Sequence, residues 1–157
     1  MENLYAPLKP KGVAISPDGR FVVLALAPNV LREGEATSSG GMLAVHRFDA
    51  EAGIIAPKAV AAISGTPAAL HAVESCTILP PSSGRPFRIL AVDQAADLVR
   101  AFDFDARQGT LTSAGVFASG MSFPHGIDAS ADGRFVAIAS YGDDTLRIMR
   151  LAPDAGE

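Results

Sequence analysis

The chain has 157 residues, of which 48% are hydrophobic and 19% are charged, and its formal net charge is −4 at pH 7. This length suits a single domain with a buried core. The acidic balance without a basic stripe argues against a nucleic-acid partner, and no apolar run of about 18 residues predicts a membrane-spanning helix. The first residues carry neither a basic region nor an apolar core, so we expect no signal peptide and a cytoplasmic location.

One phrase of the sequence occurs twice. It begins at Pro10 and again at Pro124, with the shared pattern P-x-G-[VI]-x-x-S-x-D-G-R-F-V. In each copy an Asp-Gly pair separates two apolar runs, which is a strong signal of a β-hairpin. The two copies start 114 residues apart, a distance that fits two propeller blades of about 57 residues each.

A second phrase supports a period of this size. Residues 48–53 read Phe-Asp-Ala-Glu-Ala-Gly, and residues 104–109 read Phe-Asp-Ala-Arg-Gln-Gly, at an offset of 56 residues. A degraded middle copy of the first phrase then falls near residue 70, with His71 aligned to Lys11 and His125. The sequence therefore predicts three similar units.

The expected fold class is all-β, a partial β-propeller with about three blades of four antiparallel strands. We place the blades at about 12–64, 70–119 and 126–157, within a single domain 1–157. The third unit has three predicted strands, and residues 1–8 are in phase to complete its blade. The expected strands are, in chain order, 13–16, 21–26, 43–48, 54–63, 71–79, 87–92, 98–104, 111–118, 127–130, 135–140 and 145–151.

Polar side chains gather on the predicted channel face, where the links between blades meet the links between second and third strands. Imidazole titrates near neutral pH, so His125 and His71 are candidate catalytic bases or donors to an anionic ligand. The alternative is that each bonds a carbonyl of a neighbouring blade. The candidate ligand-binding residues on this face are Lys11, Glu74, Asp93, Tyr141 and Asp143.

Other polar residues are expected to be structural. Asp18 and Asp132 belong to turns, and His46 lies inside a predicted strand. Cys76 is the single cysteine, so it is expected to be a small buried hydrophobe, with a catalytic thiol as the alternative. We expect no metal and no cofactor, because the spacing of the carboxylates does not enforce a site, although a divalent cation at the channel face stays open.

Two further segments have weaker signals. Residues 27–41 form the longest stretch without a strand pattern, and we expect this loop to be mobile. Arg147 and Arg150 are expected to face solvent from the last predicted strand.

The segment from Pro124 to Leu146 resembles a blade of the lactonase-type seven-bladed propellers, the bacterial phosphogluconolactonase family, and of the related YVTN and NHL repeats. The matching pattern is P-x-G-[VI]…S-x-D-G-R-[FY]…[AS]-x-Y-G-D-[DN]-[ST]-[LIV], and the Asp-Ala-x-x-Gly turn is more particular to the lactonase type. The resemblance implies hydrolysis of a sugar lactone without an obligatory metal. It also implies a role for a histidine beside the proline of an inter-blade link, a position that His125 and, less closely, His71 match. The family's enzymes are more than twice as long as this chain.

Three functional hypotheses follow. The sequence has no nucleophile elbow, Walker loop or H-E-x-x-H motif, so the first is a non-catalytic propeller that binds a small molecule or a protein partner at its channel face. The second is a lactone hydrolase in which His125 activates water and Lys11 or Arg32 holds the developing oxyanion. The third is an inactive fragment of a longer propeller.

Self-association is the expected quaternary behaviour. Propellers close with about four to eight blades, so three blades leave an open arc. Such an arc exposes strand edges and apolar sheet faces, both of which favour association. Two chains would supply six blades, and we therefore expect a homodimer.

Overall fold

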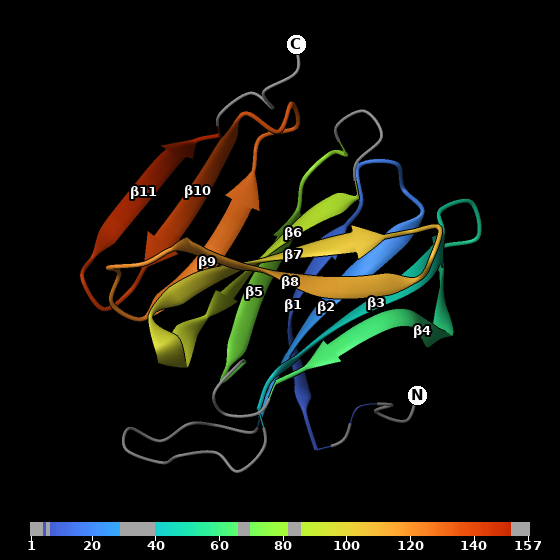
Figure 1. Ribbon diagram of the computed structural model, residues 1–157, viewed down its shortest axis with the longest axis horizontal. Helices are drawn as coiled ribbons and strands as arrows, with labels where there is room; N and C mark the ends of the chain where they lie inside the picture. The colour runs from blue at the N-terminus through green and yellow to red at the C-terminus, as the bar shows by residue number, and fades with distance from the viewer. Residues whose placement is uncertain (1–4, 6, 29–39, 66–69, 82–85, 152–157) are drawn as a thin grey trace.

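Apolar segments separated by turns form three antiparallel sheets in the computed structural model, and the sheets stand side by side in chain order (Figure 1). Within each sheet every strand pairs with the strand that precedes or follows it in the sequence. The expected all-β fold, with about three antiparallel sheets built on a four-stranded plan, is confirmed. The structure describes residues 5, 7–28, 40–65, 70–81 and 86–151.

Most strands follow the predicted segments closely, but the first strands of the first and third sheets begin four and three residues earlier than predicted. The first sheet contains β1 (Lys9–Ile15), β2 (Phe21–Ala27), β3 (Met42–Asp49) and β4 (Ile54–Ser64). The second sheet contains β5 (Val73–Ile78), β6 (Phe87–Asp93), β7 (Leu98–Asp105) and β8 (Thr110–Ala118), with a short 3₁₀ turn η1 (Gln94–Ala96) after β6. The third sheet contains β9 (Pro124–Ala129), β10 (Phe135–Ser140) and β11 (Thr145–Arg150). The described residues include no helix long and apolar enough to cross a membrane.

The first strand of each sheet lies on the inside of the arrangement. Strand β1 packs beside β5, and β5 packs beside β9. The approach of β1 to β5 is close at Gly12, where an added Cβ would lie 2.7 Å from the Cα of Ser75 and 3.1 Å from the carbonyl oxygen of Glu74. Both atoms belong to the main chain and cannot move aside, so this contact requires glycine.

Two hydrophobic clusters fill the spaces between successive sheets. Alternate residues of a strand point to opposite faces, so Phe21 and Val23 of β2 face the second sheet. There the Phe21 ring lies edge-on to Phe104, with ring centroids 5.0 Å apart. The opposite face of the second sheet, including Leu90 and Val99, packs against Ile138 of the third sheet. Burial of these apolar side chains holds the sheets together.

The repeated S-x-D-G-R phrase is a self-contained turn. The Phe21 N–H donates to the Ser16 hydroxyl at 2.9 Å, and that hydroxyl donates to the Asp18 carboxylate at 2.6 Å. The Arg20 side chain donates to the other carboxylate oxygen at 2.7 Å. The third sheet repeats all three bonds at 3.0, 2.6 and 2.6 Å, through Phe135, Ser130, Asp132 and Arg134.

These bonds stabilise the ionised turn carboxylates. In Asp132, hydrogen bonds from the Ser130 hydroxyl and from Arg134 lower the carboxyl pKa to about 2. In Asp18, burial acts to raise the pKa, but hydrogen bonds from Ser16 and Arg20 outweigh it and the pKa is lowered. Both aspartates therefore have the turn role that the sequence predicts.

The N-terminal segment packs on the first sheet. The Tyr5 hydroxyl donates to Nε2 of His46 in β3, and Nδ1–H of His46 donates to the carbonyl of Ala56 at 2.7 Å. Leu8 joins a small apolar cluster with Leu26 and Ala44. His46 is buried and structural, as expected. Of the segment predicted to complete the last blade, residues 5, 7 and 8 are described; residues 1–4 and 6 and the chain end at 152–157 lie outside the described residues.

Candidate functional site

Each inner strand carries a β-bulge near its start. In β1, Pro10 pairs with Leu26 and Gly12 pairs with Ala25, which leaves Lys11 as an extra residue. The same register shift occurs in β5 and β9. A bulge removes one residue from the ladder and re-aims its side chain. The three extra residues are Lys11, Glu74 and His125.

The three bulge residues meet, and we call them the axial cluster. Oε1 of Glu74 lies 3.5 Å from Nζ of Lys11 and 3.8 Å from Nε2 of His125. The Glu74 side chain is 14% exposed, whereas the side chains of Lys11 and His125 are 37% and 54% exposed. One carboxylate thus lies between two basic groups that remain open to solvent, an arrangement suited to binding a polar ligand.

A second cluster surrounds the buried carboxylate of Asp93, at the end of β6. Its Oδ2 accepts from Nε of Arg100 at 2.8 Å and from Nδ1–H of His71 at 3.1 Å. Its Oδ1 accepts from the backbone N–H groups of His71 and Ala72 at 3.2 and 3.1 Å. Because Nδ1 of His71 donates to Asp93, Nε2 is the nitrogen of the neutral ring that can accept a hydrogen bond. The His71 side chain is about one-third exposed.

The alignment of His71 with Lys11 and His125 is wrong. The residue of β5 that occupies their bulge position is Glu74, three positions later. The cause is the loss of the proline and glycine that mark this position elsewhere, since β5 has Val73 and a serine in their places. The spacing of equivalent positions is also uneven, 63 residues from Gly12 to Ser75 and 51 from Ser75 to Gly126.

Tyr141 is linked to the axial cluster through an aromatic ring that the sequence analysis missed. The Phe123 ring centroid lies 6.5 Å from that of His125 and 6.1 Å from that of Tyr141. Phe123 has a positive φ of 51°, and its N–H donates to Asp97 at 2.6 Å. The sequence did offer a signal, because Phe123 is an aromatic residue directly before the Pro-His-Gly phrase, in a link between two strands.

Asp143 lies in the β10–β11 turn, two residues after Tyr141. It accepts from the Thr145 hydroxyl at 2.8 Å and lies 3.7 Å from Arg147. Hydrogen bonds from the Ser140 and Thr145 side chains lower its pKa. These contacts give Asp143 a role in the turn, and the described contacts do not connect it to the axial cluster.

Two arginines differ from expectation. Arg147, predicted to face solvent, donates from Nη1 to the carbonyl of Ser119 at 3.2 Å and from Nη2 to the carbonyl of Gly120. It therefore ties β11 to the link that precedes β9. Arg100, which the sequence analysis did not single out, donates a hydrogen bond to Asp93. A charged side chain between Val99 and Ala101 in an apolar strand could have indicated a buried partner.

The remaining candidates do not add a reactive group. Cys76 is 4% exposed, and burial raises its pKa to about 12, so the thiol packs as a small hydrophobe, as expected. Within the described ranges, His, Cys, Asp and Glu side chains do not gather in groups of three that could share a metal ion. Arg32 and most of the 27–41 loop lie outside the described residues.

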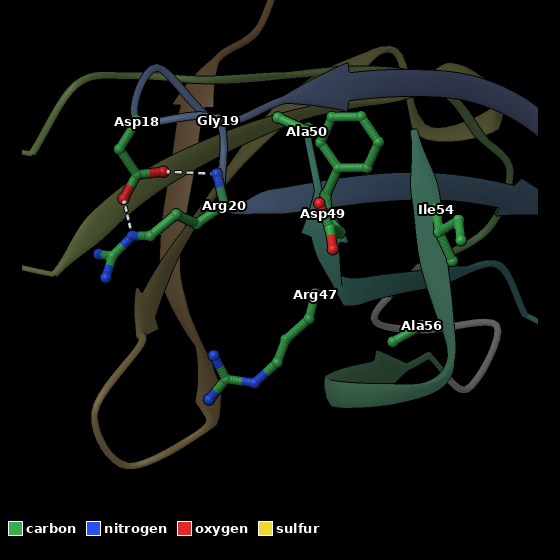
Figure 2. A pocket seen from close by; sticks show the side chains of 9 residues that line it. Asp18, Gly19, Arg20, Arg47, Asp49, Ala50, Ile54 and Ala56 are labelled. Carbon is green, nitrogen blue, oxygen red and sulfur yellow. Dashed lines mark hydrogen bonds and ion pairs between the residues drawn. The ribbon is translucent and has the colours of Figure 1, made fainter. Parts of the chain in front are cut away.

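A hollow of about 540 Å³ lies beside the β1–β2 turn, where Asp18, Gly19 and Arg20 line it (Figure 2). Figure 2 shows Arg20 turned toward Asp18, with Arg47 extended beside them. Asp49, Ala50 and Ile54 complete the part of the wall contributed by the β3–β4 turn. The predicted site residues do not line this hollow, so it is separate from the candidate site.

No protein-family model and no curated protein matches the chain. Solved structures do match. A periplasmic gluconolactonase from Pseudomonas aeruginosa superimposes with a TM-score of 0.64 at 17% identity, over 98% of this chain and 43% of the other. The fold is that of a lactonase-like β-propeller. A provisionally assigned 6-phosphogluconolactonase from Bacteroides uniformis (TM-score 0.61, 18% identity) and a protein of unknown function from Desulfotomaculum acetoxidans (0.60, 24%) cover 92% and 94% of this chain.

The chain spans less than half the length of these three proteins, 43% of the first and 40% of the other two. Their identity to this chain is 24% or lower. The likeness therefore establishes the lactonase-like fold alone.

Proposed function

We propose that the axial cluster binds a small hydroxylated acid, such as a sugar acid, on the inner face of this lactonase-like propeller. The observation that supports the proposal is that the bulge residues of three neighbouring inner strands meet: Lys11 and His125 both lie within 4 Å of one carboxylate oxygen of Glu74. Their side chains are outside the ladder and lie where successive sheets meet.

The chemistry of the cluster matches such a ligand. The Lys11 ammonium attracts a carboxylate or phosphate, and Glu74 accepts hydrogen bonds from hydroxyl groups. His125 donates or accepts according to its tautomer. The rings of Phe123 and Tyr141 add an apolar surface beside these polar groups, and small-molecule sites combine a few placed polar groups with apolar and aromatic lining.

Calorimetric titration of the full chain with D-gluconate tests this proposal. We expect binding in the wild-type chain, and about tenfold weaker binding in Lys11→Gln, because removal of a charged partner costs on the order of 1.4 kcal/mol or more. Lys9→Gln is the matched control, since Lys9 is an exposed lysine of the same strand and should bind gluconate like the wild type. Equal binding by all three proteins, or no binding by the wild type, would rule the proposal out.

Lactone hydrolysis is a second candidate, and the His71–Asp93 pair favours it. A histidine whose Nδ1–H is held by a carboxylate presents Nε2 as a general base, and His71 has this geometry at 3.1 Å. In the proposed step Nε2 removes a proton from water, and the water oxygen bonds to the lactone carbonyl carbon. The ring C–O bond then breaks, and the ring oxygen takes the proton to give the hydroxy acid.

Proton release from δ-gluconolactone measures this activity. If His71 is the base, His71→Gln lowers kcat by about a hundredfold, whereas His125→Gln raises KM more than it lowers kcat because it acts on binding. A wild-type rate equal to that of spontaneous hydrolysis would eliminate the enzyme hypothesis and leave the binding proposal standing. Loss of kcat in His125→Gln alone would instead assign the base to His125.

A further inference from the structure

The outer face of the third sheet exposes apolar side chains of β10 and β11, with the charged Asp128 and Arg150 beside them. Ala137 and Ile148, and likewise Ala139 and Leu146, are paired across β10 and β11, so all four side chains lie on one face. Leu146 is 69% exposed and Ile148 is 61% exposed; Phe135, farther along β10 on the same face, is 38% exposed. Exposed apolar side chains gathered on one sheet face mark an interaction surface rather than ordinary surface.

The corresponding face of the first sheet is an internal interface. The pairs Ala25–Leu43 and Val23–Val45 of the first sheet match Ala139–Leu146 and Ala137–Ile148 of the third. Leu43 and Val45 have no exposed area and pack toward the second sheet. On β10 and β11 the third sheet therefore presents the face by which the first sheet packs on its neighbour, whereas on β9 the exposed Asp128 stands where the first sheet has Ala14. The matched residues are Phe21, Val23, Ala25, Leu43 and Val45 in the first sheet and Phe135, Ala137, Ala139, Leu146 and Ile148 in the third.

The complementary face, on the first sheet, is exposed along β1, whereas Tyr5 and Leu8 cover its part on β2 and β3. Val13 and Ile15 of β1 are 65% and 55% exposed. Their counterparts in β5 are Cys76 and Ile78, which are 4% and 5% exposed because they pack against the first sheet. The inner strand of the first sheet thus leaves open a surface of the kind that contacts a preceding sheet, and the third sheet exposes a surface of the kind that contacts a following sheet.

We propose that a second copy of this chain covers both surfaces. The third sheet of each copy packs on the first sheet of the other, in the way that successive sheets pack within one chain. Two such contacts, related by a two-fold axis, close a ring. Two copies with three sheets each give a ring size inside the range of about four to eight blades that propellers adopt. A third copy would exceed that range, so the assembly stops at the dimer.

Light scattering after size-exclusion chromatography of the full chain gives the first test. The expected mass is twice the 16.2 kDa of one chain. A monomer at concentrations of about 100 μM, well above the Kd expected of a standard-sized interface, would overturn the proposal, as would a ladder of open-ended oligomers.

Two charge substitutions test the geometry. Leu146→Lys disrupts the third-sheet surface and Ile15→Asp disrupts the first-sheet surface, and each alone should convert the dimer to a monomer. An equimolar mixture should restore dimers, because one contact is then wild type on both sides and the other brings together opposite charges. Val116→Asp, at an exposed apolar position on the outer strand β8, is the control and should remain dimeric.

The mixture excludes the rival arrangements. If like surfaces paired with each other, one of the two variants would stay dimeric alone, and mixing would not rescue the other. If the surfaces serve further sheets of a longer polypeptide, the wild-type chain is monomeric and neither variant changes its mass. Both results would overturn the proposal, and rescue by mixing also shows that both variants are folded. Neither readout depends on ligand binding at the axial cluster.

Discussion

At its turn end, the β1–β2 hairpin carries Ser16, Asp18 and Arg20, and the β9–β10 hairpin carries the same residue types in the same places. Their hydrogen bonds agree to within about 0.1 Å, within the scatter of such bonds. At the opposite end the same two hairpins differ, with Lys11 at one bulge and His125 at the other. The repeat thus keeps one end constant and varies the other.

The difference has a physical cause. At the turn, each polar side chain satisfies a specific partner, so a change of residue type leaves a donor or acceptor without its bond. At the bulge, the extra residue is outside the ladder, so its side chain can change without loss of a ladder bond. Structure constrains the turn end, and the bulge end is available for chemistry.

The largest effect on the free energy of unfolding is expected at Gly12, beside the bulge of β1, because close packing against β5 limits the residue type there. Gly12→Ala should lower the free energy of unfolding by about 1–3 kcal/mol, because the new Cβ overlaps the main chain of β5. Gly126→Ala is the control, since its Cβ would lie 3.6 Å from the Cβ of Ala139, an ordinary contact. Urea denaturation, with Leu146→Lys present in both proteins to remove association, measures the difference. Equal losses would show that inner-strand packing does not need glycine at Gly12.

A smaller effect on the free energy of unfolding is expected for the serines at the turn end of each hairpin. Ser16→Ala removes the acceptor of a buried N–H and should cost about 1–2 kcal/mol. Ser130→Ala removes the same bonds at a more exposed site and should cost less, because water replaces the lost partner. Denaturant midpoints of the two variants give the comparison. A larger loss in Ser130→Ala would contradict the idea that burial sets the cost.

The turn carboxylates also predict an acid dependence of stability. The pKa of Asp132 in the folded state is about 2, below its ordinary value of 3.8, so the unfolded chain binds more protons between these values. Stability from this group is present above about pH 4 and is lost as the pH falls toward 2. Denaturation midpoints between pH 2 and 5 should fall less steeply in Asp132→Asn than in the wild type. Parallel curves would mean that the turn bonds do not favour the ionised form.

The smallest effect is expected for the axial cluster itself. Lys11→Gln and His125→Gln should each change the free energy of unfolding by less than about 0.5 kcal/mol, because both side chains are open to solvent and lie 3.5 and 3.8 Å from Glu74, so their contacts contribute little. The same variants are those used to test ligand binding and catalysis. Thermal denaturation checks the expectation, and a loss above about 1 kcal/mol would make the cluster structural rather than functional.

The sequence predicts the sheets well because their signals are local. An Asp-Gly turn between apolar runs identifies β1 and β2 directly, and the observed β10 has the predicted bounds, Phe135–Ser140. The residues of the candidate site are predicted less well, because their positions depend on which residues of neighbouring strands pair and on where each bulge falls. Because β5 lacks the proline and glycine that mark the bulge, the sequence pointed to His71 where the structure has Glu74. The partner of Asp93, Arg100, is set by pairing between strands.

The burial of Cys76 has a practical consequence. It is the single cysteine of the chain, and with a pKa of about 12 its thiol is hardly ionised near neutral pH. A thiol introduced at an exposed position would therefore be the only one to react with a maleimide dye. The unmodified background is already suited to single-site fluorescent labelling, and energy transfer between labelled copies becomes a direct measure of their distance.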